Sequence, residues 1–324
     1  MAIVSATKSA STKSTATEST AIESDVPDSV PSACTDREDS PGQWCAELAL
    51  GIDVLPNHGS RLTHNRHRGP LRVQKPFYPE GRECAHIYLL HPPGGLVSGD
   101  SLDIDIKLSP QAQALVTTPG AGKVYAARKN GTRQRQDVEL TLDKGAAIEW
   151  FPQESIVFNG AEASLNTRIE LAQNAVFIGW DIVCLGRPAS GAAFETGSFE
   201  QRYQFWRNKK LRFTERLVIS STDRVKNSAC GLNRQPVTGT FFATFAEGEN
   251  NCDLVRELRY RCQAYCEAAN GSGEVAVTLV RDLCIVRYLG DNTERAKMLF
   301  QSLWQLLRPR LLQREVCVPR IWRT

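Results

Sequence analysis

The sequence predicts a mainly β fold with two helices in its last third, and three observations support this class. Apolar and polar residues alternate with a period of two over much of residues 82–219, as expected for half-buried strands. Turn signals rich in glycine, proline and asparagine separate these runs every 10 to 15 residues, with no helix-length insert between them. Apolar residues at helical spacing occur only after residue 251.

Two early segments show the strand period most clearly. Leucine and isoleucine alternate with charged residues over 102–108, and Val138, Leu140 and Leu142 alternate with polar residues in the same way. A sandwich, an open barrel and a β-solenoid would all show this pattern, and no fixed repeat length chooses among them. The period therefore predicts which residues face a core, but not how the strands are arranged.

A hairpin is predicted over residues 202–213, where cations are mixed with aromatic residues. Tyr203 would point into a core, residues 208–210 would form the turn, and Leu211 and Phe213 would return toward that core. Mixed cations and aromatic residues also occur on nucleic-acid surfaces. Because the alternation explains the segment more simply, we expect no nucleic-acid binding here.

Two helices are predicted late in the chain. Apolar residues lie three and four apart over Cys252–Ala268 and again over Thr293–Leu307, with residues 291–293 as candidate caps. Between them, residues 274–289 return to the strand pattern. Pro309 is expected to end the second helix, because proline lacks the backbone N–H that a helix interior uses.

Composition separates the first residues from the rest. Residues 1–43 hold 15 Ser and Thr residues, no aromatic residue, and seven acidic against three basic residues. Such a segment has little to bury, so we expect a disordered tail followed by a single domain over residues 44–324. The remainder carries a net charge of about +7, which favours acidic partners.

The chain shows no sign of export or membrane insertion. No apolar run approaches the roughly 18 residues needed to cross a bilayer, and no secretory signal begins the sequence, so we expect a cytoplasmic location. Ten cysteines in such a chain are expected to be free thiols. Cys262 and Cys266 share one helical face and Cys252 precedes them, but no histidine lies nearby, so a zinc site is only weakly signalled.

Residues 119–123, PGAGK, resemble part of a phosphate loop. Thr117 stands where the first glycine of that loop is required, and Val124 replaces the Ser or Thr that would hold Mg²⁺. We therefore expect no nucleotide binding by this chain.

Residues 91–100, HPPGGLVSGD, join a rigid turn to permissive glycines and one carboxylate. The two prolines fix φ and remove backbone donors, while Gly94, Gly95 and Gly99 can take left-handed conformations. The turn therefore fixes the position of the Asp100 carboxylate beside the next strand. The simpler alternative is a tight turn that Asp100 caps.

Three further carboxylates stand where the pattern asks for apolar side chains. Asp181 and Glu215 share strand faces with apolar residues, and Glu149 interrupts an apolar run. An unpaired buried carboxylate costs several kcal/mol, so each needs an arginine, hydrogen bonds, a metal or internal water. Together with Asp100, the three suggest a shared hydrated interior. Arginine pairing is the structural alternative, and the candidate partners are Arg168, Arg187 and Arg216.

A path for a weakly held metal ion is the sharper interpretation of these acids. Ni²⁺ prefers nitrogen ligands, whereas carboxylates and water hold it more weakly and exchange faster. Weak oxygen ligands along a cavity would let an ion enter and leave. A closed nickel site in the body is not expected, because all histidines lie in the first third of the chain. They are His58, His64, His67, His86 and His91.

Several long motifs in a fixed order resemble the UreD family of urease accessory proteins, called UreH in some species. The likeness runs from about Leu71 to the end of the sequence, and such irregular motifs in series make a chance match improbable. The motifs are RVQKPFYPEG at 72–81, AHIYLL at 85–90, HPPGGLVSGD at 91–100, TTPG at 117–120, EWFPQE at 149–154 and GWDIVCLGRPASG at 179–191.

The resemblance carries definite expectations. It implies a β-helix-like stack of strands in a protein that is not an enzyme and that conducts Ni²⁺ through an internal channel to apo-urease. The family's acidic channel residues correspond here to Asp100, Asp181 and Glu215. The strand pattern alone adds Glu149 and Glu154 to this nickel path.

The resemblance also implies partners. These are UreF, UreG and apo-urease (UreABC), with paired copies of the chain in the accessory complex. No stably bound cofactor is expected, and GTP would act only through UreG.

Two rival functions remain open from the residues. One is an all-β carbohydrate-acting enzyme in which Glu149 and Glu154 serve as general acid and base. The other is a pure scaffold whose acids are structurally paired and which has no metal path.

Overall fold

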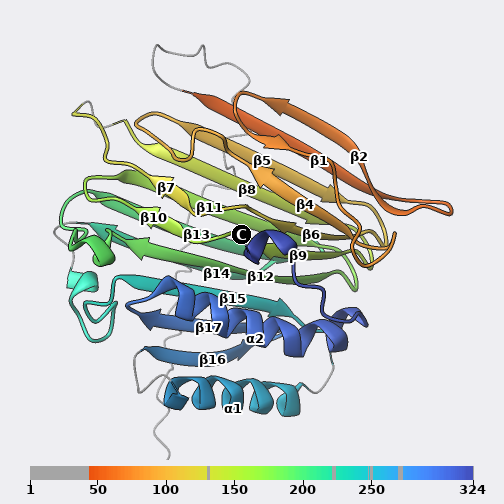
Figure 1. The fold of residues 1–324 in the computed structure, drawn as a ribbon. Helices are drawn as coiled ribbons and strands as arrows, with labels where there is room; N and C mark the ends of the chain where they lie inside the picture. Colours follow the sequence, from red (N-terminus) through yellow and green to blue (C-terminus); the bar gives the residue numbers. More distant parts are fainter. Residues whose placement is uncertain are drawn as a thin grey trace, which may run out of the picture. The chain divides into compact units, whose positions relative to one another are not determined.

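The computed structural model describes residues 44–129, 132–220, 224–246, 248, 251–268 and 273–323. The tail predicted for residues 1–43 lies outside them. The fold is mainly β with two helices in the C-terminal part, as predicted (Figure 1). The strands are β1 Cys45–Leu55, β2 Gly59–Arg68, β3 Arg72–Val73, β4 Ala85–Leu90, β5 Ser101–Leu108, β6 Gln113–Thr117, β7 Gly122–Val124, β8 Gln134–Leu142, β9 Ala147–Phe151, β10 Ser155–Val157, β11 Glu162–Leu171, β12 Val176–Leu185, β13 Ser198–Arg207, β14 Lys210–Ser220, β15 Val237–Thr244, β16 Glu274–Val280 and β17 Leu283–Gly290.

The described strands form two sheets. One has seven strands in the order β14-β13-β11-β8-β5-β1-β2, and the other has ten, of which eight follow the order β16-β17-β15-β12-β9-β6-β4-β3. From β4 to β13 the chain alternates between the sheets, with β7 and β10 as short additions to the ten-stranded sheet. Parallel strands cannot be joined by a tight turn, and here the connection between parallel neighbours runs through a strand of the opposite sheet.

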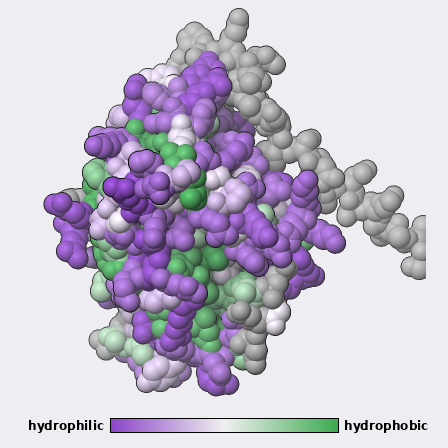
Figure 2. All heavy atoms as spheres, turned by 90° about the vertical axis from the view of Figure 1, so that its right-hand side faces the viewer, coloured by the Kyte–Doolittle hydropathy of each residue, from purple (hydrophilic) through white to green (hydrophobic). Residues whose placement is uncertain are grey.

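The main hydrophobic core lies between the two sheets. Each strand contributes every second residue to its inner face, which is the face turned toward the opposite sheet. In β11, for example, buried and half-buried residues alternate along all ten positions. The period of two in the sequence therefore reports this inner face correctly. Figure 2 shows the complementary result on the outside, where hydrophilic residues cover most of the visible face and smaller hydrophobic areas lie among them.

A second core lies on the outer face of the ten-stranded sheet, under the helices α1 (Cys252–Ala268) and α2 (Thr293–Leu312). The helix α2 contacts β12 and β15, and α1 contacts β16, beyond which it lies in Figure 1. An aromatic cluster forms part of this core, because the Phe151 ring lies 4.1 Å from Trp180 and 5.4 Å from Trp304 between centroids. Trp322, in the short 3₁₀ helix Arg320–Arg323, completes the cluster.

The second helix begins as predicted but ends later. The Asn292 side chain accepts a hydrogen bond from the Arg295 backbone N–H at 3.1 Å, as an N-cap does. Pro309 lies inside the helix rather than at its end, so the predicted stop was wrong. The carbonyl that loses its partner belongs to Gln305, an exposed residue, and water can satisfy it there.

The hairpin predicted over residues 202–213 is present as β13 and β14. Asn208 and Lys209 have φ of 50° and 61°, the left-handed pair that a two-residue turn requires. One part of the prediction was wrong, because Leu211 is exposed. The register shifts between Phe205 and Trp206, so Leu211 pairs with Trp206 on the outer face.

No helix within the described ranges is long and apolar enough to span a membrane.

We predict that Phe242→Ala lowers the free energy of unfolding by about 3 to 5 kcal/mol. Phe242 is 2% exposed on the inner face of β15, and its ring lies 4.9 Å from those of both Tyr203 and Phe205. Urea unfolding measures the loss. The control is Tyr260→Ala, since Tyr260 is 74% exposed and should change the value by less than about 0.5 kcal/mol. Equal effects of the two substitutions would contradict the inter-sheet core.

Candidate functional site

A band of polar side chains crosses the inner face of the seven-stranded sheet from β8 to β14. The pairing register sets Thr167, Tyr203 and Glu215 side by side on β11, β13 and β14. One step toward the start of β13, Gln201 lies in the same cross-strand row as Gln136, with Leu165 between them. We call this set the inner polar band. Its members are Gln134, Gln136, Thr167, Gln201, Tyr203 and Glu215.

Asp181 faces this band from the opposite sheet. It stands on the inner face of β12, a central strand, and the register aligns it with Thr240 on β15 and Arg287 on β17. Tyr203 Oη donates a hydrogen bond to Asp181 Oδ2 at 3.1 Å, which joins the two sheets. Asp181 nevertheless keeps some water-accessible surface. Asp181 is thus not sealed completely in the apolar core, although it stands on the inner face of a central strand.

The electrostatics of this pair follow from its position. Burial raises the pKa of the Asp181 carboxyl to about 7, and the hydrogen bond from Tyr203 opposes this rise. Burial, followed by the nearby charge of Asp181, raises the pKa of the Tyr203 hydroxyl well above its usual value. Near neutral pH Asp181 can therefore exist with or without its proton, while Tyr203 remains a donor.

Glu215 lies at the outer end of the band and is held by an arginine. Arg287 Nη2 lies 2.6 Å from Glu215 Oε2, and this ion pair joins β14 of one sheet to β17 of the other. The Arg287 side chain is 53% exposed, so it can leave the carboxylate without being desolvated elsewhere. The Asp181–Tyr203 and Glu215–Arg287 pairs thus lie next to each other between the sheets, because Tyr203 and Glu215 are cross-strand neighbours.

Asp100 ends the turn of residues 91–100 and is 4% exposed. Its two carboxylate oxygens accept hydrogen bonds from backbone N–H groups, that of Val97 at 2.8 Å and that of Trp44 at 3.2 Å. Gly94 and Gly99 take positive φ, as the turn requires. Asp100 therefore caps its turn, in agreement with the simpler alternative, although it also directly precedes the inner-face residues of β5.

Glu149 lies on the other face of the ten-stranded sheet, under α2, and does not share a site with Asp181. Its Oε1 accepts hydrogen bonds from Trp304 Nε1 at 2.5 Å and from Arg308 Nε at 2.9 Å. Both ends of the Glu149–Arg308 ion pair are almost completely buried. Glu149 is thus paired with an arginine, but this arginine is not Arg168, Arg187 or Arg216, the candidates from the sequence. Arg216, for example, pairs with Glu200 instead.

The same arginine binds a second acid. Arg308 Nη2 lies 2.6 and 2.8 Å from the two carboxylate oxygens of Glu80, and Glu80 also binds Arg314 and His86. Burial alone would raise the pKa of Glu80, but hydrogen bonds from His86 and Arg308 and the charges of both arginines lower it to about 2.

One group of metal-ligand types stands out in the described part of the chain. Ligand atoms of Glu80, His86 and Cys317 lie within 4.8 Å of one another. The two guanidinium groups already neutralise Glu80, so a cation entering this group would have to displace them. We therefore assign the group to the buried charge network rather than to nickel.

The remaining candidates are dispersed. Glu154 is partly buried near Lys297 of α2; burial lowers the pKa of Lys297, and the charge of Glu154 opposes this. Cys252 is exposed, Cys262 is buried and Cys266 is intermediate. The described residues thus bring no histidine, carboxylate or third thiol close enough to complete a site around these cysteines.

The loop rejected as a phosphate site is a strand. Gly122–Val124 forms β7, so no helix begins after Lys123 to receive a phosphate.

Sequence reasoning missed three members of the inner site. Tyr203 was assigned to the core correctly, but its hydrogen bond to Asp181 was not foreseen, and Thr240 and Arg287 were not singled out. The available signal was chemical, because a carboxylate at an inward position requires a donor nearby. Nothing in the sequence says which donor, since Tyr203 reaches Asp181 across the gap between two sheets.

Comparison with known proteins gives a consistent result. The family model for the UreD urease accessory protein matches residues 45–323. The chain is 43% identical over 289 residues to the urease accessory protein UreD of Marinomonas sp. (strain MWYL1), covering 87% of this chain and 90% of that protein. It is 40% identical over 292 residues to UreD of Psychromonas ingrahamii, covering 87% and 94%. UreD of Saccharophagus degradans is 41% identical over 281 residues, covering 86% and 94%.

We predict that Arg308→Met lowers the free energy of unfolding by about 3 to 5 kcal/mol, because it leaves Glu149 and Glu80 with less compensation in a buried site. Arg310→Met is the matched control on the same helix. Arg310 pairs with Glu257 on the surface, and its loss should change the value by less than about 1 kcal/mol. Chemical denaturation measures both variants. A Glu149→Gln/Arg308→Met double variant should recover part of the loss, and no recovery would contradict the pairing.

Asp181→Asn should stabilise the protein at higher pH. The pKa of Asp181 is about 7 in the folded chain against an ordinary value of 3.8, so the folded state holds the proton more tightly. Stability is then lost as pH rises from about 4 to about 7, and the asparagine variant escapes this loss. The free energy of unfolding of the variant minus that of the parent should therefore increase by about 2 to 3 kcal/mol from pH 5 to pH 8.

Urea unfolding of parent and variant at the two pH values measures this gain. Asp253→Asn is the control, because it makes the same chemical change at an exposed side chain at the start of α1, outside the space between the sheets. A pH-independent effect of Asp181→Asn would show that the carboxyl is ionised throughout.

Proposed function

The chain belongs to the UreD family of urease accessory proteins, and we propose that it serves urease maturation by carrying Ni²⁺ between its two sheets toward apo-urease. Proteins of this family are accessory proteins rather than enzymes. Nickel is the cargo in this proposal, so only weak and transient binding is required of the chain.

The observation that carries the proposal is the placement of Asp181. This carboxylate stands on the inner face of a central strand, keeps some exposed surface, and has only a tyrosine hydroxyl as its bonded partner in the described chain. Such a placement lowers the stability of the fold, which favours a functional role for the side chain. A divalent cation would stabilise its charged form. One or two carboxylate oxygens with water hold Ni²⁺ weakly enough to release it, which conduction requires.

The inner polar band supplies the rest of the path. We infer that amide, hydroxyl and carboxylate oxygens from Gln136 to Glu215 offer successive contacts to a hydrated ion, in a region where most other inward residues are apolar. Asp100 lies at the β5 side of this face and Glu215 at the β14 side. For an ion to bind Glu215, Arg287 must move away, and its exposure makes that movement inexpensive.

The partners are proposed from the family. The chain would bind apo-urease (UreABC) together with UreF and UreG, in paired copies, with GTP acting only through UreG. Its net charge of +3 and the basic balance of residues 44–324 suit acidic surfaces on such partners.

A carbohydrate-acting enzyme is disfavoured by the geometry. Glu149 is held by Trp304 and Arg308 under α2, so it cannot exchange protons with a bound substrate. A pure scaffold without a metal path is the second candidate, and the ion pair of Glu215 with Arg287 is the observation in its favour.

We also infer that β4 to β13 form the β-helix-like stack that the family implies. Support comes from the alternation of these strands between two sheets and from their parallel pairing within each sheet.

We predict that Asp181→Asn and Glu215→Gln leave complex assembly intact and lower nickel-dependent urease activation at least several-fold, because each removes one charged oxygen ligand from the path. Co-purification with the urease partners measures assembly, and urease activity after nickel addition measures delivery. Glu139→Gln is the matched control, since Glu139 lies on the outer face of β8 with its side chain 52% exposed. Normal urease activation by a double variant that still assembles would contradict the nickel path and would favour the pure scaffold.

A further inference from the structure

The seven-stranded sheet ends at β14, whereas the opposite sheet continues past it. The Glu215–Arg287 ion pair places β14 across from β17, and β16 lies one strand further on. Figure 1 shows β17 and β16 lying beyond β14, on the side away from β13. In the described part of the chain, no strand of the seven-stranded sheet therefore covers the inner face of β16.

The side chains of β16 show this difference between its two faces. Val275, Val277 and Leu279 pack toward the helices, on the outer face of the sheet. The residues that alternate with them are all exposed, although the inner face is mostly buried elsewhere. The cross-strand register continues this exposed side onto β17. We call the combined area the uncovered inner surface, and its members are Glu274, Ala276, Thr278, Arg287 and Leu289.

The strand β14 borders this surface and is itself paired on one side only. Within the described ranges its single strand partner is β13. Backbone N–H and C=O groups on its other side can therefore accept a further strand. Phe213 and Leu217, on the inner face of β14, pack against the main core but stay only partly buried. A strand added beside β14 would cover both side chains and would lie over the uncovered inner surface.

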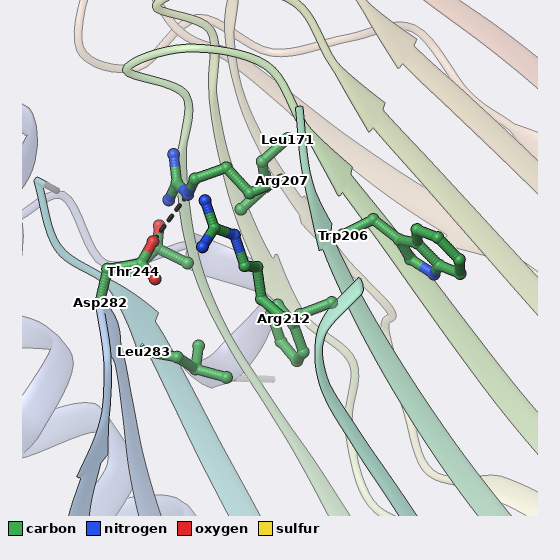
Figure 3. A pocket seen from close by; sticks show the side chains of 8 residues that line it. Leu171, Trp206, Arg207, Arg212, Thr244, Asp282 and Leu283 are labelled. Carbon is green, nitrogen blue, oxygen red and sulfur yellow. Dashed lines mark ion pairs between the residues drawn. The ribbon is translucent and has the colours of Figure 1, made fainter. Parts of the chain in front are cut away.

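The hairpin end of β14 is fixed against the opposite sheet. Arg207, the last residue of β13, forms an ion pair with Asp282 in the turn between β16 and β17, with 2.6 Å between Nε and Oδ2. Figure 3 shows this pair spanning the space between the two elements. The open side of β14 and the uncovered inner surface are thus held together before anything binds, which lowers the cost of ordering them.

The outer face beside this edge has an excess of positive charge. Arg216 Nε lies 2.7 Å from Glu200 Oε1, and Arg202 Nη2 lies 3.3 Å from the same oxygen. Both arginines are exposed, and they share this one carboxylate. Acidic side chains on the outer face of an added strand would therefore be attracted to this edge.

We propose that the open side of β14 binds an extended segment of a partner protein, which adds one strand to the seven-stranded sheet. In this segment apolar residues would alternate with acidic ones, because successive side chains of a strand point to opposite faces. The apolar residues cover Leu217 and Leu289, and the acidic residues lie beside Arg216. A second copy of the chain would bring further arginines to the same edge, so it fits less well than an acidic partner.

The test uses the full chain and a capped peptide of about eight residues that alternates Glu and Val. Titration calorimetry should show saturable binding, and hydrogen exchange followed by mass spectrometry should slow in β14. Ala276→Glu should weaken binding about tenfold or more, because it adds a like charge to the uncovered inner surface. Ala264→Glu is the matched control, since it makes the same change at an exposed residue of α1 and should keep the affinity.

A second peptide of the same composition places all its Glu residues before all its Val residues, so it cannot present one acidic and one apolar face. Equal binding of the two peptides, or equal binding to the parent and to Ala276→Glu, would overturn the proposal. Unchanged exchange in β14 would overturn it too. A dimer of the parent that Ala276→Glu dissociates would assign the edge to a second copy instead. None of these measurements involves nickel, so this edge and the nickel path can fail separately.

Discussion

The two sheets turn their inner faces toward each other, and this constrains every side chain placed there. An inward group meets the opposite sheet rather than bulk water, so a polar group must find its partner across the gap. Tyr203 meets Asp181 in this way at 3.1 Å, and Arg287 meets Glu215 at 2.6 Å. These two polar pairs therefore depend on strands that are distant in sequence being held in register, which the apolar majority of the inner faces accomplishes.

The strands and helices follow from local patterns, but their arrangement does not. A period of two identifies residues such as Ile104 and Leu140 as inward, because alternation reports burial on one face. It contains no information on which strand lies beside which, since the parallel pairs are set by contacts across whole strands. Two local errors have similar causes. Residues before and after Pro309 pack against the second core, so α2 continues through a proline that disfavours a helix interior. A register shift turns Leu211 to the outer face.

The same limit applies to the candidate site. A carboxylate in an apolar strand was detectable at both Asp181 and Glu149, because the same departure from alternation occurs at each. The strands that carry them, β12 and β9, are neighbours in one sheet, yet the two side chains lie on opposite faces. Alternation distinguishes two faces of a strand but does not say which face meets the other sheet and which meets a helix. Glu149 therefore ends in an ion pair under α2, whereas Asp181 lies between the two sheets and meets Tyr203.

The edge strand β2 has a consequence for how copies of the chain can meet. In the described part of the chain it pairs only with β1, and its second half, from His64 to Arg68, is exposed and carries arginine and histidine but no acid. An open edge offers unpaired backbone groups that a neighbouring chain could extend. Two identical edges brought together would oppose rows of like charge, so self-recognition through β2 is discouraged. Charge repulsion therefore opposes a twofold arrangement of the protein that is built on this edge.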